Sequence, residues 1–170
     1  MQRIAKFEKV SYEQFAGAYK DDFGGSDDDI RKVYDSIKLP KRATAGSAGY
    51  DFYTPVDITL LPGQTVKIPT GIRAKMDRDW VLMIFPRSGL GFKYRLQLNN
   101  TVGVIDSDYY DSDNEGHIFI KITNDSNEGK TVEVGAGGGF AQGLFMPYGI
   151  TEDDDVTDSR NGGFGSTDGR

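Results

Sequence analysis

Residues 81–89 read VLMIFPRSG, in which five uninterrupted apolar residues are closed by a proline and followed by a polar loop. An apolar run this short is typical of a buried strand, because a buried helix usually extends over about ten residues or more. We therefore predict a central strand over 81–85 that is buried on both faces. Such a strand would hold the following loop, which begins at Arg87, in a fixed place.

Similar short apolar runs lie on both sides of this strand, at 66–68, 118–122 and 131–134. Gly, Pro, Asp and Asn separate them, and no periodic stretch long enough for a helix recurs after Pro40. Many short strands with turn residues between them are typical of an all-β barrel or sandwich. The sequence thus predicts one β-domain, which we place at 39–150.

Residues 1–38 have a different pattern, and we assign them to an N-terminal extension that is partly helical. Ser11 with Gln14 three residues later resembles a helix-capping box, and Ser26 precedes apolar residues spaced along one helical face. We expect two short helices joined at Gly24 and Gly25.

Residues 151–170 begin with an acidic stretch and end Gly-rich, with too little apolar content to fold alone. We predict that they form a mobile C-terminal arm.

Composition narrows the chemistry further. The 170 residues carry a net charge of −6, no cysteine and a single histidine, His117, which excludes disulfides, thiolate chemistry and a His-based zinc site. A metal would therefore be a hard ion held by oxygen, such as Mg²⁺. The acidic balance argues against nonspecific nucleic-acid binding, and no apolar run is long enough for a membrane span. With no signal-like N-terminus, the expected location is cytoplasmic.

Five polar, glycine-rich clusters carry the chemistry. They are AGSAGYD (45–51), PRSGLG (86–91), NNTVGVIDSDY (99–109), GGGFAQ (137–142) and RNGGFGST (160–167). In the second cluster a guanidinium, a hydroxyl and backbone amides together suit phosphate oxygens. In the third, Asp106 ends a short β-branched run, where its carboxylate could accept a proton from a water that attacks phosphorus. Each cluster alone could also be an ordinary turn.

In this order the five clusters resemble the five motifs of the homotrimeric dUTPase family, over about three quarters of the chain. The resemblance implies a jelly-roll-like β-barrel (β-clip) protomer, with three protomers around a threefold axis and active sites that each combine several chains. It also implies Mg²⁺-assisted hydrolysis of dUTP to dUMP and pyrophosphate, which keeps uracil out of DNA.

The same resemblance assigns roles in the nucleoside half of the site. Asp106 would orient and activate the attacking water and contact the 3′-hydroxyl. Tyr109 would pack under the sugar and exclude a 2′-hydroxyl. Asn100 and the neighbouring hairpin, including Gly103 and Ile105, would bind the uracil edge. A small pocket there would reject thymine by size and cytosine by an unpaired polar group.

Phosphate contacts are implied in the same way. Arg87, Ser88 and Gly89 resemble the phosphate cradle, and Gln142 a further phosphate contact. Asp51 would hold waters of a Mg²⁺ ion that is chelated mainly by the triphosphate.

In the C-terminal arm, Phe164 would stack on uracil beside Gly165. Arg160, Ser166 and Thr167 would bind the β- and γ-phosphates.

Three departures from the family pattern stand out. Gly139 occupies a position that is usually Arg, so one phosphate or interface contact is missing. The acidic insertion, residues 110–115, separates Tyr109 from Gly116, and we expect it to form a protruding hairpin tip outside the pocket. Residues 1–38 have no counterpart in compact members of the family.

Three other functions share features with this pattern. A dCTP deaminase would share the fold, but Lys121 stands where that branch carries its catalytic glutamate. A regulatory protein partner, bound through the acidic insertion and the N-terminal helices, could coexist with hydrolysis. A capsid-type jelly roll would not explain the ordered polar clusters. For His117, a packed or hydrogen-bonded role is expected rather than catalysis.

Overall fold

The computed structural model describes residues 2–158 of the chain. Its helical elements are α1 (Tyr12–Phe23), α2 (Asp27–Ser36), α3 (Ser88–Tyr94) and the 3₁₀ helix η1 (Ser107–Asp111). The strands of the first half are β1 (Ala5–Lys9), β2 (Lys41–Arg42), β3 (Tyr50–Tyr53), β4 (Ile58–Leu60), β5 (Thr65–Pro69) and β6 (Ile72–Met76). Those of the second half are β7 (Trp80–Pro86), β8 (Leu96–Leu98), β9 (Gly103–Ile105), β10 (Phe119–Asn124), β11 (Val132–Val134) and β12 (Gly139–Pro147).

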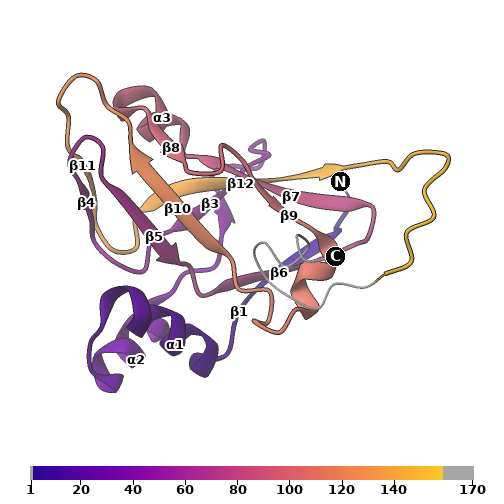
Figure 1. Ribbon diagram of the computed structural model, residues 1–170, viewed down its shortest axis with the longest axis horizontal. Coiled ribbons are helices and arrows are strands. Elements are labelled where there is room, and N and C mark those ends of the chain that lie inside the picture. The colour runs from indigo at the N-terminus through magenta and orange to yellow at the C-terminus, as the bar shows by residue number, and fades with distance from the viewer. Residues whose placement is uncertain (1, 159–170) are drawn as a thin grey trace.

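The strands form four small sheets around one core, as the ribbon in Figure 1 shows. The largest has the order β2-β3-β12-β7-β9, and the second has the order β5-β10-β8. The pairs β1-β6 and β11-β4 complete the body, and the strand pairings of residues 2–158 are antiparallel. The prediction of an all-β, jelly-roll-like fold is confirmed.

Strand β7 lies in the middle of the largest sheet, as predicted, but it is buried on one face only. Leu82 and Ile84 are fully buried, whereas Val81, Met83 and Phe85 on the other face are half-buried. The prediction of burial on both faces was wrong because no further layer of the described chain covers the outer face of this sheet.

The N-terminal helices begin where the sequence predicts. Ser11 and Ser26 are the N-caps, and their side chains accept hydrogen bonds from the backbone N–H groups of Gln14 and Asp29. Both helices lie below β5 and β6 in Figure 1 and form a helical pair outside the barrel. Strand β1 precedes the helical pair in the chain and β2 follows it, so in the sequence the pair lies between two strands. Strand β1 itself pairs with β6.

The helical pair docks on the barrel at Gly71. This residue has φ +70°, and an added Cβ would lie 2.4 Å from Ile37 Cδ1 and 3.1 Å from Phe15 Cδ2. Phe15 is fully buried and Ile30 nearly so. A glycine is therefore required here both for the backbone conformation and for the close approach of the helices.

The acidic insertion, residues 110–115, is held against the body at both ends, while Asp111 and Asp113 are exposed. Ser112 is buried, and its hydroxyl donates to the Tyr109 carbonyl oxygen. The Tyr110 hydroxyl donates to Glu8 in β1, and Glu115 accepts two hydrogen bonds from Ser11. The prediction of a hairpin was wrong, because the segment continues the 3₁₀ helix η1 into turns. Partners about a hundred residues earlier in the chain satisfy the polar groups at its two ends.

His117 is packed and hydrogen-bonded, as predicted. Its side chain is fully buried, and its Nε2 accepts a hydrogen bond of 2.9 Å from the backbone N–H of Gly71. Burial lowers the pKa of His117 to about 4, while the neighbouring Glu115 carboxylate acts in the opposite direction. The imidazole is therefore neutral in the folded chain at neutral pH.

This buried histidine makes stability depend on pH. An unfolded chain takes up a proton at His117 near pH 6.5, but the folded chain does so only near pH 4, so stability is lost as the pH falls between these values. We expect a loss of about 3 kcal/mol from this residue. Urea unfolding at several pH values and one protein concentration measures it, with His117→Gln as the comparison. An equally steep pH dependence in the variant would contradict the assignment.

No helix within residues 2–158 is long and apolar enough to cross a membrane.

Candidate active site

One group of predicted residues meets where β3, β12 and the end of β7 lie side by side. Asp51 and Gln142 are directly opposite each other in the β3–β12 ladder. Arg87 follows β7, and its backbone N–H donates to the Phe140 carbonyl oxygen of β12. Its Nε lies 3.7 Å from Oδ1 of Asp51, a carboxylate only 9% exposed. The first, second and fourth clusters therefore build one polar surface, which we call the phosphate face: Asp51, Arg87 and Gln142.

Glycines make room for the two long side chains of the phosphate face. A Cβ at Gly139 would lie 3.2 Å from Nη1 of Arg87, so the guanidinium rests against this backbone. An arginine at position 139, as in the usual family pattern, would have to share that space with Arg87. A Cβ at Gly49 would lie 2.4 Å from Cδ of Gln142, which places Gln142 directly over the first cluster.

This contact predicts the effect of Gly49→Ala. The added methyl group must displace the Gln142 carboxamide, which belongs to a flexible side chain, so the fold should tolerate the change. The resemblance implies that Gln142 contacts a phosphate, and loss of one hydrogen bond to such a charged group should raise the KM for the nucleotide about 10-fold. Steady-state kinetics and thermal unfolding check this, with Gln142→Ala expected to give the same rise. An unchanged KM in Gly49→Ala, with KM raised in Gln142→Ala, would show that Gln142 stays in place.

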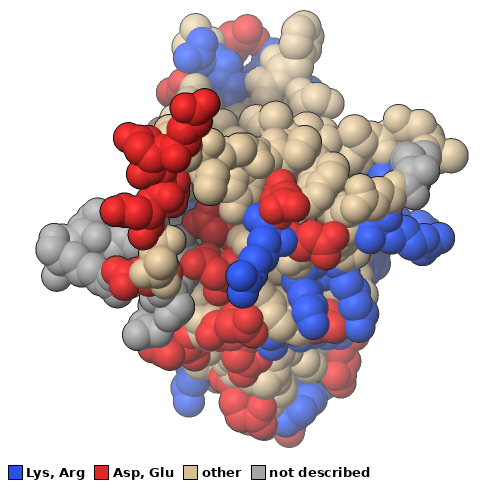
Figure 2. Space-filling model, turned by 90° about the vertical axis from the view of Figure 1, so that its right-hand side faces the viewer, with Lys and Arg blue, Asp and Glu red and all other residues tan. Residues whose placement is uncertain are grey.

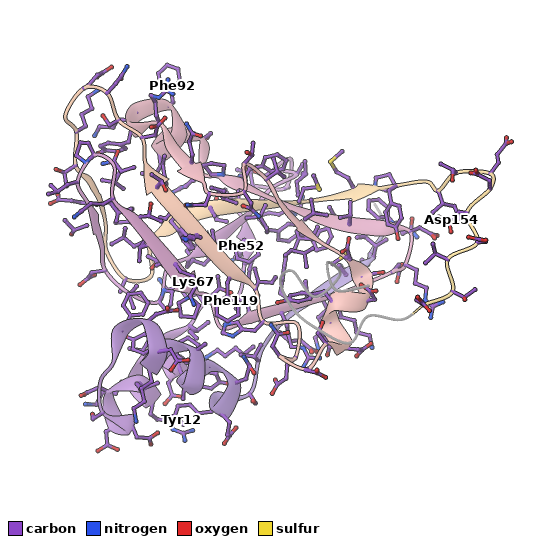
Figure 3. All side chains as sticks on the ribbon, viewed as in Figure 1. Tyr12, Phe52, Lys67, Phe92, Phe119 and Asp154 are labelled. Carbon is purple, nitrogen blue, oxygen red and sulfur yellow. The ribbon has the colours of Figure 1, made fainter. Side chains whose placement is uncertain are left out.

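Ser88 and Gly89 are exposed and open α3, whereas the sequence suggested an irregular loop. Arg87 is the N-cap residue of this helix, in an extended conformation. Phe92 of the same helix is 97% exposed and points away from the body in Figure 3.

A second group lines a cavity of about 420 Å³ beside the turn that joins β8 to β9. Its walls combine the predicted Asn100, Gly103 and Ile105 with apolar side chains from the core. Its full lining is Lys67, Ile84, Leu98, Asn99, Asn100, Gly103, Ile105, Phe119, Ile120 and Lys121. A mostly apolar cavity with a few polar groups at its rim suits a small planar base. We call it the base pocket.

Sequence reasoning missed Lys67 and Phe119 of this pocket. Lys67 on β5 lies opposite Lys121 on β10 and pairs with Asp22 of α1 at 3.1 Å. Its Nζ is 5.4 Å from the centroid of the Phe119 ring, and Figure 3 shows both side chains between the strands and the helical pair. The strand pattern alone could not find them, because it does not fix which strands pair.

Asp106 and Tyr109 follow β9 at the start of η1. Asp106 is half-buried and is the N-cap residue of η1, and Tyr109 is 3% exposed. The Tyr109 hydroxyl donates to the His117 carbonyl oxygen at 2.7 Å and accepts from Asn114 Nδ2 at 2.8 Å. The hydroxyl is thus engaged within the chain, and the side chain as a whole is nearly fully buried.

The phosphate face and Asp106 lie near opposite ends of the β7–β9 ladder. Leu82 is opposite Ile105 and Ile84 is opposite Gly103, so Asp106 lies level with the start of β7 while Arg87 follows its end. At about 3.3 Å per residue, their backbones are about 20 Å apart along the strand. One chain therefore does not bring them to the same phosphorus atom.

Magnesium was expected to bind mainly to the substrate. Within residues 2–158 no three acidic or histidine side chains gather as a metal site. Asp51 is a single buried carboxylate beside Arg87, which fits a role toward metal-bound water better than direct capture of the ion. Figure 2 shows that one face of the molecule carries both acidic and basic side chains. Because the net charge is −6, positive charge for a polyphosphate must come from local groups such as Arg87.

The fifth cluster, with Arg160, Phe164, Gly165, Ser166 and Thr167, lies outside the described residues. Its roles remain a prediction.

Comparison with known proteins agrees with this geometry. A family model described as dUTPase matches residues 35–168. The deoxyuridine 5'-triphosphate nucleotidohydrolase of Lactococcus lactis subsp. lactis (strain IL1403) is 42% identical over 134 residues, 77% of this chain and 88% of that protein. The protein of the same name from Shigella flexneri is 38% identical over 142 residues, 79% of this chain and 89% of that one.

Among solved structures, the dUTPase from Streptococcus mutans superposes with a TM-score of 0.63 at 36% identity and covers 86% of this chain and 98% of its own. The dUTPase from phage phi11 of S. aureus gives a TM-score of 0.61 at 19% identity, with 92% and 97% covered. At that identity the phage structure supports the fold alone.

Proposed function

Because the chain belongs to the dUTPase family, we propose that it hydrolyses dUTP to dUMP and pyrophosphate through attack of water at the α-phosphorus. The observation that carries this proposal is the base pocket, because strand β9 in its wall ends at Ile105 and is followed directly by Asp106. A base bound in the pocket would place its sugar and α-phosphate near that carboxylate. Solved phage 80alpha dUTPases contain dUpNHpp, an analogue of this substrate.

The proposal assigns a role to each of these residues. The Asp106 carboxylate accepts a proton from the attacking water and holds that water in line with the bond to be broken. The Tyr109 ring packs under the deoxyribose and excludes a 2′-hydroxyl. Arg87, with Ser88 and Gly89 beside it, binds the charged phosphate oxygens, and Gln142 adds a neutral hydrogen bond.

Magnesium is part of the proposal. A structure of the phage phi11 dUTPase describes the coordination of a structural Mg(II) ion in that protein. In this chain, Asp51 would hold metal-bound water, and the ion would supply charge neutralisation on the triphosphate. The requirement is tested by loss of hydrolysis with EDTA and its recovery with Mg²⁺.

We further propose that the active form is a homotrimer with sites shared between chains. The outer face of the largest sheet is apolar, and the register of β12, β7 and β9 aligns its members. They are Val81, Met83, Phe85, Val104, Leu144 and Met146, of which Val104 is 54% and Met146 43% exposed. A monomer rarely exposes such a surface, and a second copy that covered it would also bring a second Arg87 toward Asp106.

Two alternative functions, deamination of dCTP and binding of a regulatory partner, are affected by the structure in different ways. A lysine at position 121 borders the base pocket, and a cationic side chain there does not supply the carboxylate that deamination needs. A regulatory partner remains a prediction: Tyr110 and Glu115 of the acidic insertion are engaged by Glu8 and Ser11, so only Asp111 and Asp113 would be available to it.

The test is incubation of the purified protein and Mg²⁺ with dUTP, dCTP, dTTP and UTP in parallel, followed by measurement of pyrophosphate and of base identity. We expect pyrophosphate from dUTP alone. Ammonia release from dCTP would move the protein to the deaminase reaction. If none of the four nucleotides gives a product, the result would favour a regulatory binding function over catalysis.

A further inference from the structure

The N-cap residue of helix α1, Ser11, contacts the segment that follows Tyr109 through hydrogen bonds to a carboxylate. The Glu115 carboxylate accepts hydrogen bonds from the backbone N–H of Ser11 at 2.7 Å and from its hydroxyl at 2.6 Å. These hydrogen bonds lower the pKa of Glu115, so the side chain is charged at neutral pH. The Ser11 hydroxyl also caps α1 by accepting from the Gln14 backbone N–H. The start of α1 and the end of the acidic insertion are thus joined.

The backbone around Glu115 is held in an unusual conformation. Glu115 has φ +59°, in the left-handed region that non-glycine residues rarely adopt, and Gly116 follows with φ +70°. A Cβ at Gly116 would lie 2.7 Å from the Tyr109 carbonyl oxygen. Such a conformation persists where surrounding contacts hold it, and here the chain is pressed directly against Tyr109.

His117 connects α1 both to Tyr109 and to the base pocket. Its Nδ1 lies 3.4 Å from Gln14 Nε2, and its carbonyl oxygen accepts from the Tyr109 hydroxyl. Its ring centroid is 4.3 Å from that of Phe119, which lines the base pocket. One residue therefore touches α1, the proposed sugar platform and the base pocket.

We infer that α1 positions Tyr109, and that the pair of Ser11 and Glu115 is the contact through which it does so. Glu115 is a positioning residue, since no contact with the nucleotide is required of it. The inference rests on the role proposed above for Tyr109, which is to exclude a 2′-hydroxyl by packing under the sugar. If the segment shifts, the ring no longer fills that space, and the preference for dUTP over UTP weakens.

The test compares the ratio of kcat/KM for dUTP to that for UTP in full-length variants. Glu115→Gln is expected to lower the ratio about 10-fold, because small displacements of a positioning group have effects of this order or larger. Ser11→Ala is also expected to lower the ratio. Ser11→Thr keeps the hydroxyl, so its ratio should stay close to that of the wild type. The Ser11 variants keep the test decisive even if Glu115→Gln does not fold.

Glu13→Gln is the matched control, because Glu13 is an exposed carboxylate in the first turn of the same helix. Its ratio should equal that of the wild type. The inference is overturned if Glu115→Gln and Ser11→Ala unfold at lower temperature yet keep the wild-type ratio, because the contact would then be structural only. A wild-type protein that hydrolyses dUTP and UTP equally well would overturn the role of Tyr109 as well.

Discussion

Asp106→Asn should lower kcat for dUTP hydrolysis about 1000-fold, within the range by which a positioned general base accelerates a reaction. The amide keeps the size of the side chain but cannot accept the proton of the attacking water at neutral pH. Asp106 is half-buried at the end of β9, next to the base pocket, so the substituted side chain stays beside the substrate. KM for dUTP should therefore change by only a few-fold, as measured by steady-state kinetics.

Asp108→Asn is the control for this variant. Asp108 lies two residues further along the same 3₁₀ helix and is exposed. It should retain nearly full activity with the same change in charge. Comparable losses in the two variants would mean that acidity of the segment, and not a base at position 106, supports catalysis.

Arg87→Ala should lower kcat/KM for dUTP about 100-fold. The guanidinium is the cation of the phosphate face, and removal of one preorganised donor to a developing negative charge has an effect of this size. The same change leaves Asp51, 9% exposed, without the cation 3.7 Å away, which should repel the phosphates further. Arg87→Lys should recover only part of the loss, since a lysine cannot form a bidentate contact.

Arg95→Ala provides the matched control for Arg87. Arg95 is also exposed and paired with an aspartate, Asp125, at 2.9 Å, but it lies at the opposite end of α3. Its removal should leave kcat/KM within about 2-fold of the wild type, as is usual for an exposed ion pair. An equal loss in both arginine variants would point to general electrostatic attraction and would contradict a specific phosphate contact.

Local patterns in the sequence predicted the elements that local physics determines. The caps at Ser11 and Ser26 and the strands around 66–68, 81–85, 118–122 and 131–134 all appear in the structure. Capping depends on residues three apart, and a strand depends on its own apolar run, so both can be read without knowledge of the fold.

Features that depend on distant partners were missed or wrong. Strand β1 reads AKFEK, with only one deeply buried residue, and it is a strand because β6 pairs with it from far along the chain. Acidic composition suggested a solvated tip at 110–115, but Ser11 and Glu8 supply hydrogen bonds that sequence spacing cannot reveal. The glycines of PRSGLG suggested a loop, yet Ser88–Tyr94 is helical.

In the candidate site, too, some features were predicted from the sequence and others depend on distant strand pairing. The phosphate face joins Asp51, Arg87 and Gln142, as their likeness to family motifs implied. The base pocket adds Lys67 and Phe119, which no motif marked. The separation of Arg87 from Asp106 follows from the register of β7 and β9, and register is fixed by pairing across the whole sheet.

The central claim is that Asp106 of one chain acts together with Arg87 of another, and mixing two inactive variants tests it most directly. Asp106→Asn and Arg87→Ala proteins are unfolded together, refolded at a 1:1 ratio and assayed with dUTP and Mg²⁺. Random assembly of shared sites predicts recovery of about one quarter of wild-type activity, because one site in four combines two intact residues. A mixture no more active than its separately refolded components would contradict the claim and place both residues of each site in one chain.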